Sequence, residues 1–284
     1  MAVPETNSGP DFFCVGAQKA GTGWLYEQLR EHPDFWMPPL KELHYFDRLG
    51  RPRRRKRQDR LQRARKSVRD DRDLRFLDRM ENMSTQSGLD LASYAALFEP
   101  KGALISGDIT PGYSALPHET VAQVMAHFPQ SKVIFIARDP VERAWSQLSM
   151  WVRHGIIMPF GESDFDLVTR HLQKPEVAAR SYPSEIVVCW RKYVSPESFG
   201  LYFFDDLKRA AAEVRRNIIQ FLGGDATRPS GNLAVDHNPK AAKEKIRLTD
   251  EMRAHLAKFF ERELKACASE LGGPAQEWPA HYGL

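Results

Sequence analysis

The sequence has few cysteines and no long apolar run. Its three cysteines, Cys14, Cys189 and Cys267, lie far apart, without the spacing of a metal-ligating pair. This argues against a disulfide framework or a zinc site, and it is typical of a protein of the reducing cytoplasm, where we expect this chain to reside. No run approaches about eighteen consecutive apolar residues, so we expect no membrane span. The opening MAVPETNSGPD lacks the basic and apolar regions of a signal peptide.

What the sequence does contain is a local excess of positive charge. The net charge of the 284 residues is +4, but residues 48–79 hold fifteen Lys/Arg against five Asp, a balance of +10, and the remainder carries −6. A basic block can bind nucleic acid, an acidic glycan or an anionic membrane, and the alternative is a solvated helix or a disordered arm. Apolar residues make up 42% and aromatic residues 11% of the chain. This composition supports a large core and excludes global disorder.

Short apolar segments alternate with helical patterns along the chain. Strand patterns occur at 11–16, 104–107, 132–137 and 200–204. Helical patterns occur at 24–30, 118–128, 140–153, 164–173, 182–194, 205–222 and 249–271, with weak helical periodicity over 55–81. There is no hairpin signal and no internal repeat. We therefore predict an α/β fold: a single domain over residues 1–284 with a central parallel sheet flanked by helices, carrying a basic insertion at 48–79.

The first motif is Gly16-Ala-Gln-Lys-Ala-Gly-Thr-Gly23, between a strand pattern and a helix pattern. Glycines allow a tight turn in which successive N–H groups face one anion, and the following helix adds its positive N-terminal end. Lys19 adds a charge and Thr22 a hydroxyl. The segment predicts a P-loop-like phosphate-binding strand-turn-helix. It is not a Walker A loop, because Lys19 precedes Gly21 instead of following the second glycine.

The second motif is Arg138-Asp-Pro-Val-Glu-Arg-Ala-Trp-Ser146, directly after the clearest strand pattern. Asp139 is a good N-cap and Pro140 suits the first helical position. Arg138 would leave the carboxyl end of the strand, where ligands bind in open α/β sheets. Ser146 would lie about two turns into the helix on the same face. The planar fork of arginine suits a phosphate, so the pair predicts a second phosphate contact.

Together these motifs resemble the sulfotransferases that use 3′-phosphoadenosine 5′-phosphosulfate (PAPS), closest to the bacterial relatives of the heparan sulfate and glycan sulfotransferases. The resemblance covers nearly the whole chain, apart from residues 48–79. It implies PAPS as co-substrate and no metal. Lys19 would contact the bridging oxygen and the 5′-phosphate, and Arg138 with Ser146 the 3′-phosphate. The implied cofactor-binding residues are Gln18, Lys19, Ala20, Gly21, Thr22, Gly23, Trp24, Arg138, Ser146, Ser181 and Tyr182, with Lys240 or Lys243 from a late loop.

Two departures from the family pattern stand out. The family usually has a second Thr or Ser after Thr22, where this chain has Gly23, so one hydroxyl contact is lost. The segment Asp108-Ile-Thr-Pro-Gly-Tyr113 resembles a family turn that normally carries a lysine at the position of Ile109. In heparan sulfate enzymes that lysine helps at the active centre. Its absence puts a heparan-type acceptor in doubt and favours a less anionic one.

The segment Lys41-Glu-Leu-His-Tyr-Phe46 resembles the part of the glycan branch that carries the proposed general base. By this resemblance Glu42 is the base, with His44 as its rival and a structural role as a further alternative. Glutamate titrates near 4.3 in peptides, so it is ionised at neutral pH. The two residues can both face the acceptor only if the segment is a loop rather than a helix.

We therefore expect a sulfotransferase that moves a sulfuryl group from PAPS to a hydroxyl, in preference to an amine, of a carbohydrate or other small-molecule acceptor, with Glu42, Lys19 and His44 as catalytic residues. One alternative is a P-loop-type phosphotransferase. The other is a non-enzymatic nucleic-acid-binding protein acting through the basic segment, which lacks stacking aromatics between residues 51 and 69. We expect residues 51–66 to form a solvated arm or helix outside the nucleotide site, as a candidate surface for an anionic partner.

Overall fold

A computed structural model describes residues 9–48, 54–83, 88–161, 163–229, 231, 233–236 and 246–284 of the chain. Within these residues one four-stranded sheet has the order β2-β1-β3-β4, and every pair of neighbours is parallel. Its strands are β1 (Phe12–Gly16), β2 (Gly107–Ile109), β3 (Lys132–Ala137) and β4 (Phe199–Phe203). This sheet confirms the predicted α/β fold class.

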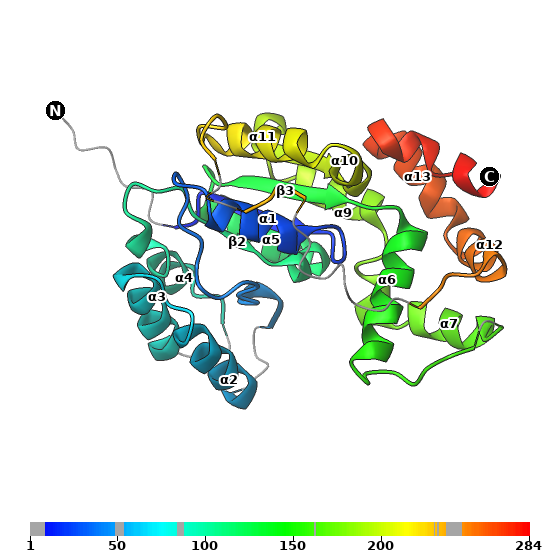
Figure 1. The fold of residues 1–284 in the computed structure, drawn as a ribbon, viewed down its shortest axis with the longest axis horizontal. Helices are drawn as coiled ribbons and strands as arrows, with labels where there is room; N and C mark the ends of the chain where they lie inside the picture. Colours follow the sequence, from blue (N-terminus) through cyan, green and yellow to red (C-terminus); the bar gives the residue numbers. More distant parts are fainter. Residues whose placement is uncertain are drawn as a thin grey trace.

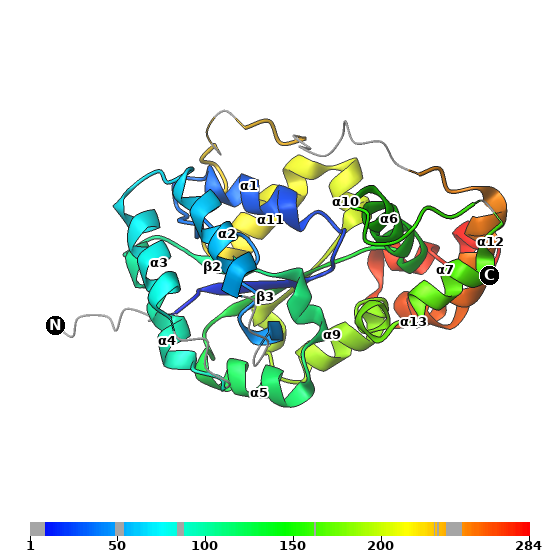
Figure 2. The same cartoon turned by 90° about the horizontal axis from the view of Figure 1, so that it is seen from below.

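The central strands are apolar because helices cover both faces of the sheet. Residues 12–15 of β1 and 133–137 of β3 are fully buried, as expected for strands inside a parallel sheet. On one face lie α1 (Thr22–Arg30) and α11 (Ala211–Leu222), and on the other α5 (His118–His127) and α9 (Pro183–Arg191) (Figure 2). The carboxyl ends of β1 and β3 therefore lie between these layers, where each continues into a loop and a helix.

The remaining helices gather at the two ends of the molecule (Figure 1). One end carries α2 (Arg54–Arg65), α3 (Asp71–Asn82) and α4 (Leu91–Ala96). The other carries α6 (Pro140–Arg153), α7 (Phe165–Leu172), α12 (Asp250–Phe259) and α13 (Glu261–Leu271). Two short helices, α8 (Pro175–Ala178) and α10 (Phe204–Arg209), complete the set. In the part of the chain that the structure describes, no helix is long and apolar enough to cross a membrane.

Three predicted elements need correction. The strand expected at 104–107 lies later, at Gly107–Ile109, because Phe12 of β1 pairs with Gly107 and its ring fills the space where a Cβ would sit. Asp108 is therefore part of a buried strand and not of a turn. The helix expected over 205–222 is interrupted at Ala210, and the one expected over 249–271 is interrupted at Phe260.

Residues 51–66 are expected to form a solvated arm or a helix, and their described part, from residue 54 on, is the helix α2. Leu61 and Ala64 of α2 are buried, and α2 packs against α3. The helix α3 is in turn anchored by Trp36, whose Nε1 donates to the buried Asp73 carboxylate over 3.0 Å. The helical pattern of α2 is weak in the sequence because Leu61 and Ala64 are apolar residues among many arginines.

Candidate active site

The turn after β1 is built to bring backbone N–H groups together. Helix α1 begins at Thr22, and its cap residue Gly21 has φ 93°, in the left-handed region. A Cβ at Gly21 would lie 2.4 Å from Leu207 Cδ2, so any other residue there would also have to displace the Leu207 side chain. Gly21 has no side chain with which to cap the helix, and the first N–H groups of a helix have no partners within it. This end of α1 is therefore suited to an anion.

The side chains of the turn differ in where they are directed. Thr22 and Ala20 are buried, and Gln18 Oε1 is a buried oxygen with no hydrogen-bond partner among the described residues. Trp24 Nε1 donates to the carbonyl of Val235 over 2.6 Å, which ties the helix to the late part of the chain. Gly23 stands where the family usually has Thr or Ser. A Cβ added there would meet nothing within 4 Å, so a hydroxyl-bearing side chain has room.

Arg138 lies where the sequence predicts, at the end of β3 and against the turn. Its Nη1 donates to the carbonyl of Lys19 over 2.6 Å, and its guanidinium stacks on the Phe204 ring at 4.5 Å. The side chain is only 14% exposed, and burial lowers the pKa of Arg138. Lys19 Nζ lies 3.7 Å from the Met150 sulfur of α6. The two predicted phosphate contacts are therefore neighbours.

One face of α6 looks toward this turn. Residues 142, 146 and 150 follow one another at intervals of four and so share a face of the helix. Met150 contacts Lys19, and Glu142 contacts Arg138 at 3.5 Å, so Ser146 lies on the same face between them. Ser146 is partly exposed. The pairing of Arg138 and Ser146 at a phosphate stays a prediction.

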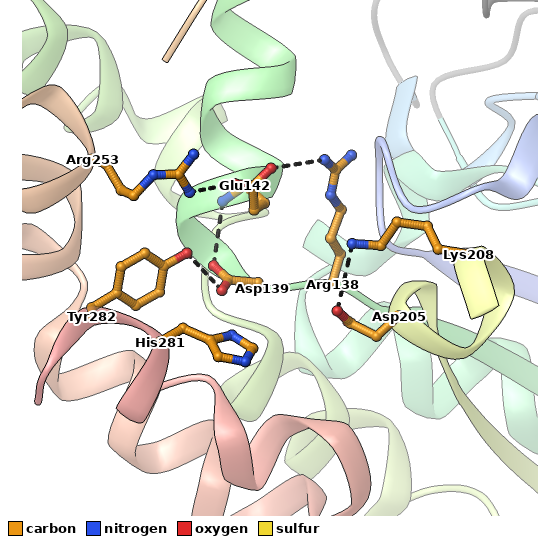
Figure 3. Close-up of a pocket in the computed structure, with 8 residues that line it drawn as sticks. All are labelled: Arg138, Asp139, Glu142, Asp205, Lys208, Arg253, His281 and Tyr282. Carbon is orange, nitrogen blue, oxygen red and sulfur yellow. Dashed lines mark hydrogen bonds and ion pairs between the residues drawn. The ribbon is translucent and has the colours of Figure 1, made fainter. Parts of the chain in front are cut away.

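A pocket opens beside Arg138 (Figure 3). It is lined by Arg138, Asp139 and Glu142 from the end of β3 and α6, Asp205 and Lys208 from α10, and Arg253, His281 and Tyr282 from the C-terminal part of the chain. Three acidic and three basic side chains line it, with His281 and Tyr282. The Tyr282 hydroxyl donates to Asp139 over 2.8 Å, and Asp139 also caps α6 by accepting from Val141 N over 2.8 Å.

The other predicted nucleotide contacts, Ser181, Tyr182, Lys240 and Lys243, come from later parts of the chain. The Ser181 hydroxyl is buried, donates to the Val177 carbonyl and accepts from Arg143 over 2.6 Å, so its hydrogen bonds are satisfied inside the protein. Tyr182 precedes α9, and its ring lies edge-on to Phe260. Lys240 and Lys243 lie outside the described residues.

Arg143 is a residue that the sequence reasoning missed. It is fully buried, and its guanidinium donates to Gln147 and Ser181, both uncharged. Burial lowers its pKa to about 9, and the positive charge of Arg138 acts in the same direction. A buried cation with two neutral partners adds positive potential near Arg138.

Residues 41–45 form a loop before a short 3-10 helix (Phe46–Arg48), and this loop brings Glu42 and His44 together. His44 Nε2 lies 3.2 Å from Glu42 Oε2, and His44 Nδ1 lies 2.8 Å from Asp47 Oδ2. Lys41 Nζ donates to Glu42 Oε1 over 2.8 Å. Glu42 has φ 62° and His44 φ 55°, both in the left-handed region that ordinary residues seldom adopt. The loop condition under which both side chains can face one acceptor is met.

The pKa values of Glu42 and His44 are shifted in opposite directions. Burial opposes ionisation of Glu42, but hydrogen bonds from His44 and Lys41 outweigh it and hold the pKa of the Glu42 carboxyl well below its usual range. Burial likewise opposes the charge of His44, yet its bonds to Asp47 and Glu42 raise the pKa of His44 above its ordinary value. At neutral pH the carboxylate of Glu42 is therefore ionised, and protonation of His44 is favoured.

Two contacts from distant parts of the chain hold this loop. Arg60 Nη2 of α2 donates to the carbonyls of Lys41 and Glu42, over 2.8 and 2.6 Å. The amide of Tyr45 donates to the Tyr113 hydroxyl over 3.1 Å. Nothing in the sequence distinguishes Arg60 from its basic neighbours.

The Tyr113 contact leads to a buried carboxylate. Asp108 is 1% exposed and accepts hydrogen bonds from the hydroxyls of Tyr113, Tyr94 and Thr110, at 2.7, 2.8 and 2.6 Å. Burial raises its pKa, and these three bonds oppose the rise. Asp108 therefore supports the loop from beneath through Tyr113. Among the described residues, no group of His, Cys, Asp or Glu side chains is arranged to hold a metal ion.

Comparison with known proteins places this chain in a family. The family model described as "Sulfotransferase family" matches residues 10–228. A sulfotransferase from Alicyclobacillus acidocaldarius has the same fold at 22% identity and a TM-score of 0.67, over 95% of this chain and 98% of that one. No curated protein sequence matches the chain.

More distant structures share the fold. The sulfotransferase domain of the Synechococcus PCC 7002 olefin synthase aligns at 16% identity and a TM-score of 0.53, over 92% of this chain and 98% of that one. Mouse sulfotransferase SULT7A1, solved in complex with PAP, aligns at 14% identity and a TM-score of 0.51, over 98% and 92%. Since the family model spans well over half of the chain, this protein belongs to the sulfotransferase family.

Proposed function

We propose that the protein transfers a sulfuryl group from PAPS to a hydroxyl of a carbohydrate or other small-molecule acceptor, and releases 3′,5′-ADP. The observation that carries the proposal is the contact between Arg138 and the turn at Lys19, which joins two predicted phosphate contacts into one site. The mouse relative was solved with PAP, which supports the same donor here. The three cysteines are free thiols, which supports a cytoplasmic location.

The residues present suit such a donor. The start of α1 after Gly21 offers N–H groups, and Lys19 and Arg138 offer cationic donors beside it. Arg138 Nη2 makes a long contact, 3.5 Å, with Glu142, so this part of the fork can turn to an anion. We assign Lys19 and the α1 amides to the 5′-phosphate that departs, and Arg138 with Ser146 to the 3′-phosphate.

We assign the role of general base to Glu42. In the reaction the S–O bond to the 5′-phosphate breaks while an S–O bond to the acceptor forms, and the acceptor loses its proton. Glu42 is ionised and can accept that proton, whereas the raised pKa of His44 favours the imidazolium form, which has no lone pair with which to do so. A carboxylate with a low pKa is a weak base. It suffices here because the acceptor oxygen becomes strongly acidic as it bonds to sulfur.

Ligand-dependent unfolding separates this proposal from its alternatives. Thermal melting is measured with 3′,5′-ADP, with ATP and Mg²⁺, and with a single-stranded RNA. A sulfotransferase is stabilised by 3′,5′-ADP, by about 2.7 kcal/mol at a concentration a hundredfold above Kd. Stabilisation by ATP and Mg²⁺ alone would indicate a phosphotransferase, and stabilisation by RNA alone would indicate binding through the basic segment. Transfer of label from ³⁵S-PAPS to a panel of sugars, phenols and amines then identifies the acceptor.

A further inference from the structure

One carboxylate in the pocket beside Arg138 is shared by two arginines (Figure 3). Glu142 Oε1 accepts from Arg253 Nη1 over 2.8 Å, and Glu142 Oε2 lies 3.5 Å from Arg138 Nη2. Arg253 comes from α12 and lies 111 residues after Glu142 in the chain. The contact with Arg253 is a good charge-assisted hydrogen bond, whereas the contact with Arg138 is at the outer limit of one.

The other two carboxylates of the pocket have partners of their own. Asp205 lies 3.6 Å from Lys208 Nζ on the same helix. Asp139 accepts from the Tyr282 hydroxyl and caps α6. Glu142 is thus the pocket carboxylate that competes for Arg138.

The position of Glu142 creates a problem for an anionic donor. It lies one helical turn after Arg138, on the face of α6 that carries Ser146, which is where we assign the 3′-phosphate. A carboxylate there would repel a phosphate dianion, and it would also hold the guanidinium that the phosphate needs. Something must draw Glu142 away from Arg138 and balance its charge.

We infer that Arg253 is a positioning residue for the 3′-phosphate of the donor: it binds and neutralises Glu142, and so leaves Arg138 available to the phosphate. The inference rests on the proposed function. Arg253 acts through Glu142 and need not touch the donor. Its effect is therefore specific to nucleotides that carry a 3′-phosphate, and it disappears when Glu142 has no charge. An ion pair that merely joins α6 to α12 would show neither property.

The test is a double-mutant cycle on nucleotide binding, measured by calorimetry with 3′,5′-ADP and with 5′-AMP. Arg253→Met is expected to weaken 3′,5′-ADP more than tenfold and 5′-AMP less than twofold. Glu142→Gln alone is expected to bind 3′,5′-ADP at least as tightly as the wild type. In the double variant, Arg253→Met is expected to cost less than twofold. The matched control is Lys258→Met. Lys258 is an exposed cation on the same helix, and it pairs with Glu261.

Each outcome has a distinct meaning. Equal binding of both nucleotides by the wild-type protein overturns the donor assignment, and the inference with it. Selective binding by the wild type, combined with a double variant that remains as weak as Arg253→Met, overturns the inference alone. Equal losses for both nucleotides in Arg253→Met do the same, because they indicate a structural ion pair. If Arg253→Met melts below the assay temperature, Arg253→Lys replaces it: retention of most of the 3′,5′-ADP affinity supports neutralisation by charge, and a full loss contradicts it.

Discussion

The donor side and the acceptor side of the candidate site are held in place in different ways. On the donor side, Lys19 and Arg138 follow strands β1 and β3 directly, so the parallel sheet itself brings them to one edge. On the acceptor side, Glu42 and His44 lie on a loop with left-handed backbone angles, held by Arg60 and Tyr113 from distant segments. Topology fixes the first site, and long-range side-chain contacts fix the second.

The acceptor loop needs these contacts because its backbone is strained. A left-handed conformation costs an ordinary residue roughly 1–2 kcal/mol. Hydrogen bonds from a charged group such as Arg60 contribute about 1.5–3 kcal/mol each. The two bonds from Arg60 are therefore of the size required to hold Glu42 and His44 in place. A perturbation of the donor side should change affinity for the donor, and a perturbation of the acceptor side should change turnover.

The largest effect on turnover is expected from Glu42→Gln. Glutamine keeps the size of the side chain but accepts no proton, so turnover should fall by about 10²–10⁴-fold, the usual contribution of a general base. Binding of 3′,5′-ADP should stay within twofold. His44→Ala should cost less. Steady-state kinetics with ³⁵S-PAPS and calorimetry with 3′,5′-ADP measure both quantities. Normal turnover of Glu42→Gln beside an inactive His44→Ala would assign the base to His44.

The pH profile gives an independent measure of the same assignment. The pKa of Glu42 is lowered, so a base at this position stays ionised throughout the range from pH 5 to 7. The pKa of His44 is raised, so a base there would be lost progressively as the pH falls through and below neutrality. We expect kcat/KM to stay level toward acid pH. A decline that is already under way at neutral pH as the pH is lowered would point to His44.

On the donor side, the largest expected effect is on affinity for 3′,5′-ADP, from Arg138→Ala. Arg138→Ala removes a charge-assisted hydrogen bond worth roughly 1.5–3 kcal/mol and should weaken 3′,5′-ADP about ten- to hundredfold. Binding of 5′-AMP should change much less, since it lacks the 3′-phosphate. Calorimetry with both nucleotides is the measurement. Equal losses would show that Arg138 supports the turn at Lys19 rather than the 3′-phosphate.

The same contrast explains what could be predicted from the sequence. The strand and helix patterns around Lys19 and Arg138 are local, and the structure places both residues as predicted. Arg60, Glu142 and Arg253 acquire their partners only in the folded chain. Within α2, Arg60 faces the loop while Arg65 pairs with Asp78 and Glu81 of α3. The sequence does not distinguish these arginines. Their directions follow from the orientation of α2, whose Leu61 and Ala64 are buried.

A smaller effect should separate these two arginines. Arg60→Ala removes the bonds to the loop carbonyls, and release of the backbone strain at Glu42 and His44 offsets most of that loss. A remaining loss of about 1.4 kcal/mol lowers the population of the competent loop, and hence turnover, up to tenfold. Affinity for 3′,5′-ADP should not change. The matched control is Arg65→Ala, whose exposed ion pairs contribute little. Arg60→Lys should recover part of the activity. Equal turnover in Arg60→Ala and Arg65→Ala would mean that the loop keeps its conformation without the hydrogen bonds from Arg60.

The smallest expected effect is a gain on the donor side, from Gly23→Ser. The position lies in the first turn of α1 with no atom within 4 Å of the added Cβ, so serine fits without displacing a neighbour. A restored hydroxyl contact worth roughly 0.5–1 kcal/mol should tighten 3′,5′-ADP about two- to fivefold. Replacing glycine inside a helix also stabilises the fold, by up to about 1 kcal/mol for alanine. Gly23→Ala is therefore the control: thermal melting should rise in both variants, and calorimetry should show tighter binding in Gly23→Ser alone. Equal affinities in the two variants would mean that a side chain at position 23 points away from the phosphate, and that the donor is held by backbone and cations without it.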